Sequence, residues 1–250
     1  MNWTADDGTI IHYETHGDAR RPALLLLPGL LGSISKQWQS FIEPLVGHYF
    51  VVLMDLRGHG RSENKEPSLE TGRMVQDIVG LLDHLEITAV RISGYSLGGY
   101  LGMQLAISHP RRVATLHTHA TKFYWTSDAV AKMQKQLDPD KMAEKVPAYA
   151  NQLVLEHGGR RWRELVRQAA DLVASLEQNG LTEQNVQQIR CPTLISVGDR
   201  DEVVGIGEAL SVSRLFDRGG LLVLPGVRHP IHTLSLIPLL PMLQSFHKNR

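Results

Sequence analysis

The chain has 250 residues, of which 42% are hydrophobic and 21% are charged, a composition typical of a globular protein with a sizeable core. Its 26 Lys and Arg side chains balance its 26 Asp and Glu side chains, so the basic excess of a nucleic-acid-binding protein is missing. One cysteine excludes an internal disulfide, the first residues lack the apolar run of a signal peptide, and no apolar stretch is long enough to cross a bilayer. We therefore expect a cytoplasmic protein of one or two domains that binds neither nucleic acid nor membrane.

Short apolar runs alternate with amphipathic segments of helical length along most of the chain. Strands that alternate with helices form βαβ units, which predicts an α/β fold with a mostly parallel sheet and helices on both faces. Residues 1–16 instead predict a hairpin, an antiparallel edge on that sheet. The expected strands are Ala23–Leu27, Phe50–Met54, Ala89–Ser93, Val113–His117, Thr193–Val197 and Leu221–Leu224, and the expected helices are Ser35–Val46, Leu69–Leu85, Gly98–Ser108 and Glu208–Phe216.

One long segment, residues 122–188, contains no strand-like run and is compatible with helix almost throughout. Because it stands between two expected strands, we interpret it as a helical insertion that lies over the sheet of a core comprising residues 1–121 and 189–250; we call this insertion the cap. Phe123 and Trp125, at the junction of sheet and cap, are candidates to line a mainly apolar substrate pocket. The expected helical pieces of the cap are Ser127–Leu137, Asp140–His157, Trp162–Asn179 and Thr182–Ile189.

The sharpest chemical signal is the pentapeptide GYSLG at residues 94–98, which follows an expected strand and opens an expected helix. A G-x-S-x-G motif in that context is typical of a nucleophile elbow, a strained turn in which small flanking residues let strand and helix approach closely. The turn would expose Ser96 Oγ at its tip and direct the N–H of Leu97 into the site, where a helix N-terminus favours negative charge. The alternative is a serine in an ordinary tight turn.

A serine hydroxyl needs a base, and the base needs a carboxylate that orients it. Three acids, Asp199, Asp201 and Glu202, follow one expected strand, and His229 and His232 follow the next. Both loops come at the carboxyl ends of strands, where open parallel sheets place their ligand sites. The chain order serine, acid, histidine agrees with the order that this kind of elbow requires. The residues alone leave open which acid and which histidine act.

Three further features have more ordinary interpretations. A charged, Gly-rich turn is expected to support the site through Asp55 and Arg57 rather than to react. His117 and His119 share one face of a strand, but no third ligand has the spacing of a metal site, so we expect core packing or pocket lining, with no metal and no cofactor. Cys191 precedes a proline at a strand start and is expected to be a small buried hydrophobe.

Four blocks of sequence together make the chain similar to the α/β-hydrolase fold superfamily of serine hydrolases. The blocks are LPGLLG at residues 27–32, DLRGHGRS at 55–62, GYSLGG at 94–99, and CPTL at 191–194 with the GDRD turn at 198–201 that follows it. The second and third blocks are together highly specific to this superfamily, and the resemblance covers nearly the whole chain. It implies a hydrolase fold with a helical cap after the sixth strand.

The resemblance also implies roles for residues at matching positions. The acid of this pattern stands three residues after the glycine that ends its strand, which corresponds to Asp201, and the histidine of its Pro-Gly-x-x-His block corresponds to His229. The residue after the family's His-Gly pair supplies the second oxyanion N–H and corresponds to Leu30. Pro28 replaces the usual histidine of that pair, and Arg228 stands where glycine is common, but neither departure removes a catalytic group.

The combined pattern predicts a serine esterase that acts on a small or medium acyl substrate through an acyl-enzyme intermediate. Its catalytic residues would be Ser96, Asp201 and His229, with the N–H groups of Leu30 and Leu97 as the oxyanion hole. A lactonase or a C–C bond hydrolase would use the same residues. A slow-turnover ligand sensor, a lyase or a cofactor-free oxygenase could be built on the same scaffold. The expected partner is a small ester or lactone, bound by a monomer or a homodimer.

Overall fold

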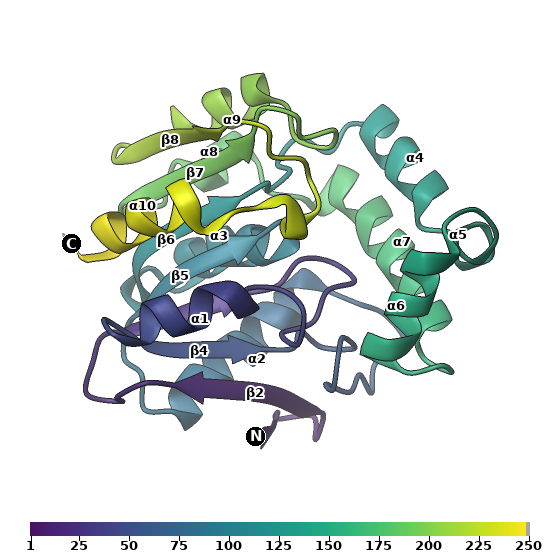
Figure 1. Cartoon of the computed structure of the whole chain (residues 1–250), viewed down its shortest axis with the longest axis horizontal. Coiled ribbons are helices and arrows are strands. Elements are labelled where there is room, and N and C mark those ends of the chain that lie inside the picture. The colour runs from purple at the N-terminus through teal and green to yellow at the C-terminus, as the bar shows by residue number, and fades with distance from the viewer. Residues whose placement is uncertain (249–250) are drawn as a thin grey trace.

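Eight strands form one sheet at the centre of the computed structural model, which describes residues 1–248 (Figure 1). Their order is β1-β2-β4-β3-β5-β6-β7-β8, with parallel pairing from β4 to β8 and antiparallel pairing of β2 with β1 and β4. The predicted mostly parallel sheet with an antiparallel edge is thus confirmed. The strands are β1 (Asn2–Thr4), β2 (Ile10–His16), β3 (Ala23–Leu27), β4 (Phe50–Met54), β5 (Val90–Tyr95), β6 (Val113–His119), β7 (Thr193–Gly198) and β8 (Gly219–Leu224).

Helices cover both faces of the sheet, as predicted. Figure 1 shows α1 and α10 in front of the sheet and α2 and α3 behind it. No helix in residues 1–248 is long and apolar enough to cross a membrane. The helices are α1 (Gln39–Val46), α2 (Thr71–His84), α3 (Leu97–Ser108), α4 (Ser127–Gln136), α5 (Pro139–Lys145), α6 (Pro147–His157), α7 (Trp162–Asn179), α8 (Glu183–Val186), α9 (Ile206–Ser213) and α10 (Leu236–Lys248), with short 3₁₀ turns at Pro110–Arg112 and Ile231–Thr233.

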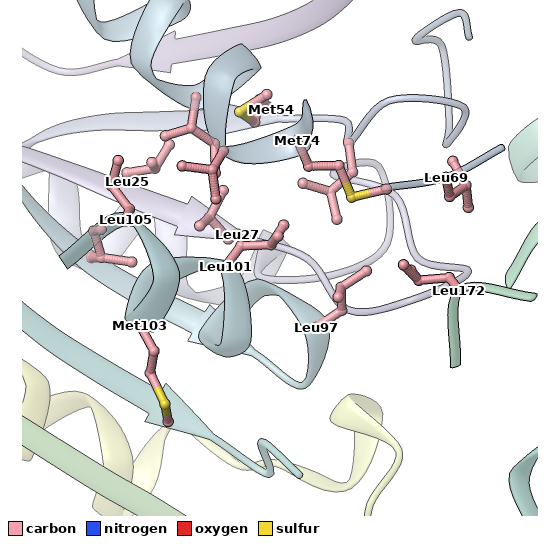
Figure 2. Packing of buried hydrophobic residues seen from close by; sticks show 14 of the residues in the cluster. Leu25, Leu27, Met54, Leu69, Met74, Leu97, Leu101, Met103, Leu105 and Leu172 are labelled. Carbon is pink, nitrogen blue, oxygen red and sulfur yellow. The ribbon is translucent and has the colours of Figure 1, made fainter. Parts of the chain in front are cut away.

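Strand β3 explains why apolar runs in this sequence become central strands. All five of its residues are buried. Leu25 and Leu27 pack in the cluster that includes α2 and α3, whereas Leu24 and Leu26 pack in the cluster that includes α1 and α10. Successive side chains of a strand point to opposite faces, so a strand covered on both sides is apolar at every position. Each buried leucine stabilises the fold by roughly 1.5–3 kcal/mol. Figure 2 shows Leu25 and Leu27 beside leucines of α3.

Five helices, α4 to α8, lie between β6 and β7 in the chain, where the cap is expected. Residues 122–188 are all described and contain no strand. Helices α4 to α7 group together at one end of the sheet, away from the helices that cover its faces (Figure 1). The expected single piece Asp140–His157 is two helices, α5 and α6, because Pro147 begins a new helix and the residue before a proline avoids the helical conformation.

The ends of several elements differ from those expected, for local reasons. Helix α1 begins at Gln39 rather than at Ser35, because Trp38 has a φ of 67° and interrupts the helical backbone. Strands β5 and β6 extend two residues beyond their expected ends, to Tyr95 and His119. Both extensions carry backbone toward the turn that holds Ser96.

Helix α10 is an element that the sequence did not predict. Prolines at 238 and 241 argue against a helix, since a proline in a helix interior removes a hydrogen bond and clashes with the preceding turn. The segment is nevertheless helical apart from Ile237, and Leu239, Leu243 and His247 are buried at a spacing of four residues. Tertiary packing against α1 therefore outweighs the local preference.

Candidate active site

Ser96 lies in the turn between β5 and α3 with a strained backbone, φ 49° and ψ −113°. Its neighbours are small for a steric reason. A Cβ on Gly94 would lie 2.4 Å from the backbone of Gly98, and a Cβ on Gly98 would lie 2.4 Å from the carbonyl oxygen of Leu27. The Ser96 N–H donates to the carbonyl oxygen of His119 on β6 (2.8 Å), which holds the turn against the sheet. Strand, strained serine and helix are arranged as a nucleophile elbow requires.

Two backbone N–H groups near Ser96 can receive an oxyanion. Leu97 is the first residue of α3, so its N–H points out of the helix at the positive end of the helix dipole. Leu30 lies in the turn after β3, which is closed by the N–H of Gly32 donating to the carbonyl oxygen of Gly29 (3.0 Å). Within residues 1–248 neither N–H has a hydrogen-bond partner, and both residues line the same cavity as Ser96.

Asp201 and His229 are in direct contact. The His229 Nδ1 lies 3.0 Å from Asp201 Oδ2, and the carboxylate, whose side chain is 0% exposed, also accepts from the N–H groups of Val203 and Val204, both at 2.8 Å. Burial by itself raises the pKa of Asp201, but the His229 hydrogen bond and charge and the two N–H donors outweigh it and lower that pKa. An ionised Asp201 holds the hydrogen on Nδ1 and leaves Nε2 of His229 as the base.

The competing candidates make other contacts. Asp199 is exposed, and its carboxylate accepts from the N–H of Gly226 (2.6 Å), so it caps the turn before the histidine. Glu202 is exposed; its carboxylate lies 3.6 Å from the Arg228 guanidinium and accepts from the backbone N–H of His229 (3.4 Å), not from the imidazole. His232 is exposed on the cavity lining, and its side chain makes no hydrogen bond or ion pair with the part of the chain that is described. Among the described residues, the fold therefore brings together the side chains of one candidate acid, Asp201, and one candidate histidine, His229.

Tyr95 is a supporting residue of the site that the sequence did not identify. Its hydroxyl donates to the backbone carbonyl of His229 (2.9 Å), and its ring centroid lies 5.7 Å from the imidazole. The only sequence signal was an aromatic residue at the variable position of the motif.

Ser96 and His229 line one cavity, but no hydrogen bond joins their side chains among the described residues. Such bonds are often long without substrate and shorten when it binds.

A cavity of about 780 Å³ lies between the elbow and helices α4 to α7, within the size range of small-molecule sites. Trp125 lines this cavity. Phe123 does not: its side chain is 3% exposed, packs edge-on against Tyr124 and belongs to the core. Its N–H donates to Glu208 (2.7 Å), so it anchors the start of this segment instead. Apolar lining side chains include Leu97 and Tyr100 of α3, Met133 of α4, Met142 of α5, and Leu172 and Leu176 of α7.

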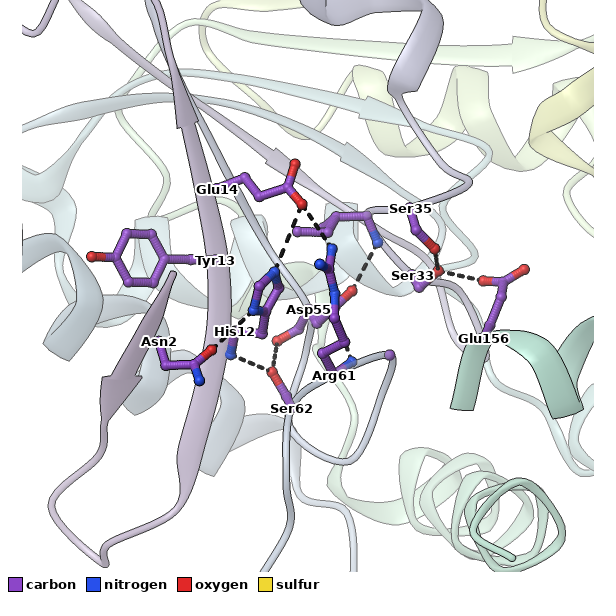
Figure 3. Close-up of polar contacts among 12 residues, drawn as sticks. Asn2, His12, Tyr13, Glu14, Ser33, Ser35, Asp55, Arg61, Ser62 and Glu156 are labelled. Atoms are coloured by element: carbon purple, nitrogen blue, oxygen red, sulfur yellow. Dashed lines mark hydrogen bonds and ion pairs between the residues drawn. The ribbon is translucent and has the colours of Figure 1, made fainter. Parts of the chain in front are cut away.

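A buried polar cluster supports the loop after β3. The Asp55 carboxylate accepts from the N–H groups of Ile34 (2.8 Å) and Arg61 (2.9 Å), which ties two loops together (Figure 3). Burial raises the pKa of Asp55, against the effect of these donors. The guanidinium of Arg57, 0% exposed, pairs with Asp77 on α2 at 2.6 Å. These contacts are those of the supporting role predicted for Asp55 and Arg57.

The side chains of the remaining candidates, His117, His119 and Cys191, make no hydrogen bond to the Ser96 side chain among the described residues. His117 and His119 are fully buried on β6, and Ser196 Oγ lies 2.8 Å from His117 Nε2 and 2.9 Å from His119 Nδ1. Within residues 1–248, no group of three or more His, Cys, Asp or Glu side chains is arranged to hold a metal ion. Cys191 is partly exposed, and burial raises the pKa of its thiol to about 11, which disfavours the reactive thiolate.

A model of the alpha/beta hydrolase fold family matches residues 22–160, more than half of the chain. The chain belongs to the α/β-hydrolase family. The predicted family and fold are thereby confirmed. The matched region contains the Leu30 turn and the elbow, and it ends before Asp201 and His229.

Curated relatives resemble part of this α/β hydrolase. The chain is 38% identical over 109 residues to 3-oxoadipate enol-lactonase 2 of Acinetobacter baylyi, covering 44% of the chain and 40% of that protein. It is 36% identical over 110 residues to the putative carbamate hydrolase RutD of Agrobacterium fabrum, covering 42% of the chain and 41% of that protein. The matched part spans less than half the length of either relative.

Solved structures match over the whole length of the chain. The 2-hydroxy-6-oxo-6-phenylhexa-2,4-dienoate hydrolase from Rhodococcus sp. strain RHA1 superposes with a TM-score of 0.84 at 21% identity, covering 99% of this chain and 98% of that one. The enol-lactonase from Burkholderia xenovorans LB400 gives a TM-score of 0.76 at 20% identity, covering 100% and 98%. At these identities the likeness establishes the fold alone, and the two proteins are named for different substrates.

Proposed function

We propose that this α/β hydrolase is a serine hydrolase that cleaves the carboxylic ester of a small or medium acyl substrate. The observation that carries the proposal is the contact between His229 and the buried carboxylate of Asp201, at the edge of the cavity that Ser96 also lines. A histidine that is oriented by a carboxylate and faces the same cavity as a serine is the arrangement that activates a serine hydroxyl.

In the first half-reaction, Ser96 Oγ bonds to the acyl carbon of the ester while His229 Nε2 takes the hydroxyl proton. The carbonyl electron pair moves onto oxygen, which accepts hydrogen bonds from the N–H groups of Leu30 and Leu97. Each such donor typically lowers the barrier by about 3 kcal/mol. Asp201 stabilises the imidazolium. The intermediate then collapses, the bond to the alcohol oxygen breaks, and the alcohol leaves with the proton from His229.

In the second half-reaction, water attacks the acyl-enzyme along the same path. His229 takes a proton from water as its oxygen bonds to the acyl carbon, and the same two N–H groups bind the oxyanion. Collapse of this second intermediate breaks the bond to Ser96 Oγ, which recovers its proton from His229, and the carboxylic acid is released.

Residues 122–188 act as a cap in this proposal. The apolar side chains that α4, α5 and α7 contribute to the cavity would hold the acyl group, with Trp125 at the junction of cap and core. Such a lining favours a small substrate whose acyl part is apolar. The site is contained in one chain, so a monomer or a homodimer could carry out the reaction.

A lactone is the second candidate substrate, because two of the similar proteins are named enol-lactonases. A lactone is an internal ester, so the same attack by Ser96 opens the ring and the alcohol stays attached to the acyl group. Cleavage of a C–C bond is the third candidate reaction that the same residues could serve.

The proposal is tested with p-nitrophenyl butyrate and a panel of lactones under multiple-turnover conditions. Ser96→Ala is expected to lower kcat at least about 1,000-fold with an unchanged circular-dichroism spectrum. A fluorophosphonate probe is expected to label Ser96. Asp201→Asn should reduce kcat far more than its matched control Asp199→Asn. Most of the activity surviving in Ser96→Ala would overturn the mechanism, and the reverse ranking of the two aspartates would overturn the choice of acid.

A further inference from the structure

His157, the last residue of helix α6, is buried against the loop that carries the candidate oxyanion donor. The residue is 1% exposed. Its Nδ1 accepts the N–H of Gly60 (2.8 Å), and its Nε2 lies 3.1 Å from the carbonyl oxygen of Leu31, the residue after Leu30. An N–H only donates and a carbonyl only accepts, so the ring is neutral with its hydrogen on Nε2. Burial lowers the pKa of His157, which favours the same neutral form.

The carbonyl that His157 holds belongs to a strained residue. Leu31 has a φ of 59°, in a turn closed by the N–H of Gly32 donating to Gly29. A positive φ at the second central residue of a turn suits glycine or asparagine, and the Cβ of leucine makes it sterically unfavourable. Such a conformation persists only where the surroundings hold it. The hydrogen bond from His157 is a contact that can do so.

The ring of His157 is itself fixed in orientation. His59, which is fully buried, lies edge-on to it with ring centroids 5.9 Å apart and an interplanar angle of 87°. Arg161, beyond the end of α6, donates to the carbonyl oxygens of Gly60 (2.9 Å) and Ser62 (3.0 Å). Glu156, next to His157, accepts a hydrogen bond from Ser33 of the loop after β3 (Figure 3). The end of α6 and the residues just after it are therefore hydrogen-bonded to the loop after β3 and to the loop after β4.

We propose that His157 is a positioning residue for the hydrolysis: its Nε2–H fixes the Leu31 carbonyl and so aims the N–H of Leu30 at the oxyanion. The inference rests on the proposed function, in which Leu30 supplies one of the two donors. An oxyanion exists only after Ser96 has attacked, so loss of this aim lowers kcat and leaves KM nearly unchanged.

Three substitutions separate positioning from general stability. His157→Asn places an amide near Nδ1, within reach of Gly60, but is too short to reach Leu31. His157→Gln can provide an acceptor and a donor about as far apart as the two ring nitrogens. Arg161→Met removes the hydrogen bonds to the carbonyl oxygens of Gly60 and Ser62 but leaves the contact with the Leu31 carbonyl in place, so it is the matched control. Thermal unfolding of each variant shows how much of the protein is folded.

Two measurements are made on each variant: kcat and KM on p-nitrophenyl butyrate, and affinity for an aryl trifluoromethyl ketone. Ser96 Oγ adds to the ketone carbon, its proton passes to His229, and the resulting oxyanion occupies the hole. Loss of one oxyanion donor costs on the order of 100- to 1,000-fold in kcat. We expect a misaimed donor in His157→Asn to lower kcat on the order of 10- to 100-fold, with KM changed less than about twofold and a parallel loss of ketone affinity. His157→Gln should recover most of this loss, and Arg161→Met should stay within about threefold of wild type.

A glycine at position 31 provides an independent test, because it needs no partner to hold a positive φ. In a Leu31→Gly background, His157→Asn should lower kcat less than about threefold. The inference is overturned by an unchanged kcat in His157→Asn, by a rise in KM instead, by an equal loss in Arg161→Met, or by the same loss in the Leu31→Gly background. Wild-type hydrolysis that does not depend on Ser96 would defeat the proposed function, whereas Ser96-dependent hydrolysis with a normal His157→Asn defeats only this inference.

Discussion

Lowering the pH from 8 to 5 is expected to remove much of the free energy of unfolding, because burial holds several histidines neutral. The pKa of each buried histidine is lowered by burial, to about 4 for His119 and about 3 for His59 and His247. A histidine in the unfolded chain titrates near 6.5. The buried histidines are His12, His59, His117, His119, His157 and His247.

The direction of the effect follows from proton binding. Between about pH 6.5 and pH 4 the unfolded chain binds protons at these sites and the folded chain does not, so each proton favours unfolding. The stabilisation is complete above pH 6.5 and is lost as the pH falls. At pH 5, the three histidines with pKa values of 3 to 4 each lower the free energy of unfolding by about 2 kcal/mol, together about 6 kcal/mol. Single domains commonly have only about 5–15 kcal/mol, so the chain should be close to unfolding at pH 5.

Urea unfolding followed by tryptophan fluorescence at pH 8, 7, 6 and 5 measures this loss, because the free energy extrapolates linearly to zero urea. His247, whose ring nitrogens lie 2.9 Å from Ser93 Oγ and 2.7 Å from Thr115 Oγ1, provides the test variant. His247→Gln should be less stable at pH 8 but should lose about 2 kcal/mol less between pH 8 and pH 5. The exposed His109→Gln is the matched control. A total change below about 2 kcal/mol across this range would refute the reasoning.

Three substitutions test other parts of the structure. Gly98→Ala places a Cβ 2.4 Å from a carbonyl oxygen of β3, so we expect a loss of more than about 3 kcal/mol in the free energy of unfolding and loss of activity; a normal thermal midpoint would contradict this. Asp77→Ala leaves the fully buried guanidinium of Arg57 with Asp7 (2.7 Å) as its remaining ion-pair partner, and we expect a cost of about 3 kcal/mol, the lower end for breaking a buried pair, measured by urea unfolding. Tyr95→Phe removes the hydrogen bond to the His229 carbonyl and should cost about 0.5–1.5 kcal/mol, with kcat lowered several-fold; an unchanged kcat would show that the loop is held by other contacts.

The elbow could be predicted from the sequence because its requirements are local. Gly94, Ser96 and Gly98 lie within one pentapeptide, and the close approach that makes the glycines necessary is between a strand and the helix that follows it. The acid and the base were harder to predict, because the sequence alone allowed three acids and two histidines. Asp199 and Asp201 stand two positions apart in one turn, and what separates them is three-dimensional: only Asp201 turns inward to the histidine.

Contacts between segments far apart in the chain could not be predicted from the sequence. His157 meets Leu31 across 126 residues, and Tyr95 meets the His229 carbonyl across 134. The sequence could not distinguish Phe123 from Trp125 either, because only the packing of the folded chain decides which of these two side chains reaches the cavity. Helix α10 was missed for the opposite reason, since its prolines are a genuine local signal that burial against α1 overrides.

The chain has 12 histidines, and these contacts show what several of them do. A neutral imidazole carries one donor and one acceptor on a rigid ring, so a buried histidine can join a donor and an acceptor that belong to separate segments. His157 does this between Gly60 and Leu31, and His247 lies between two hydroxyl groups on β5 and β6. A lysine or arginine has no acceptor, and its charge is costly to bury. His229 differs in being partly exposed beside a buried carboxylate, where a transient positive charge is stabilised. Histidine thus has two tasks in this protein: fully buried, it holds segments of the fold in place, and beside a buried carboxylate it accepts the proton.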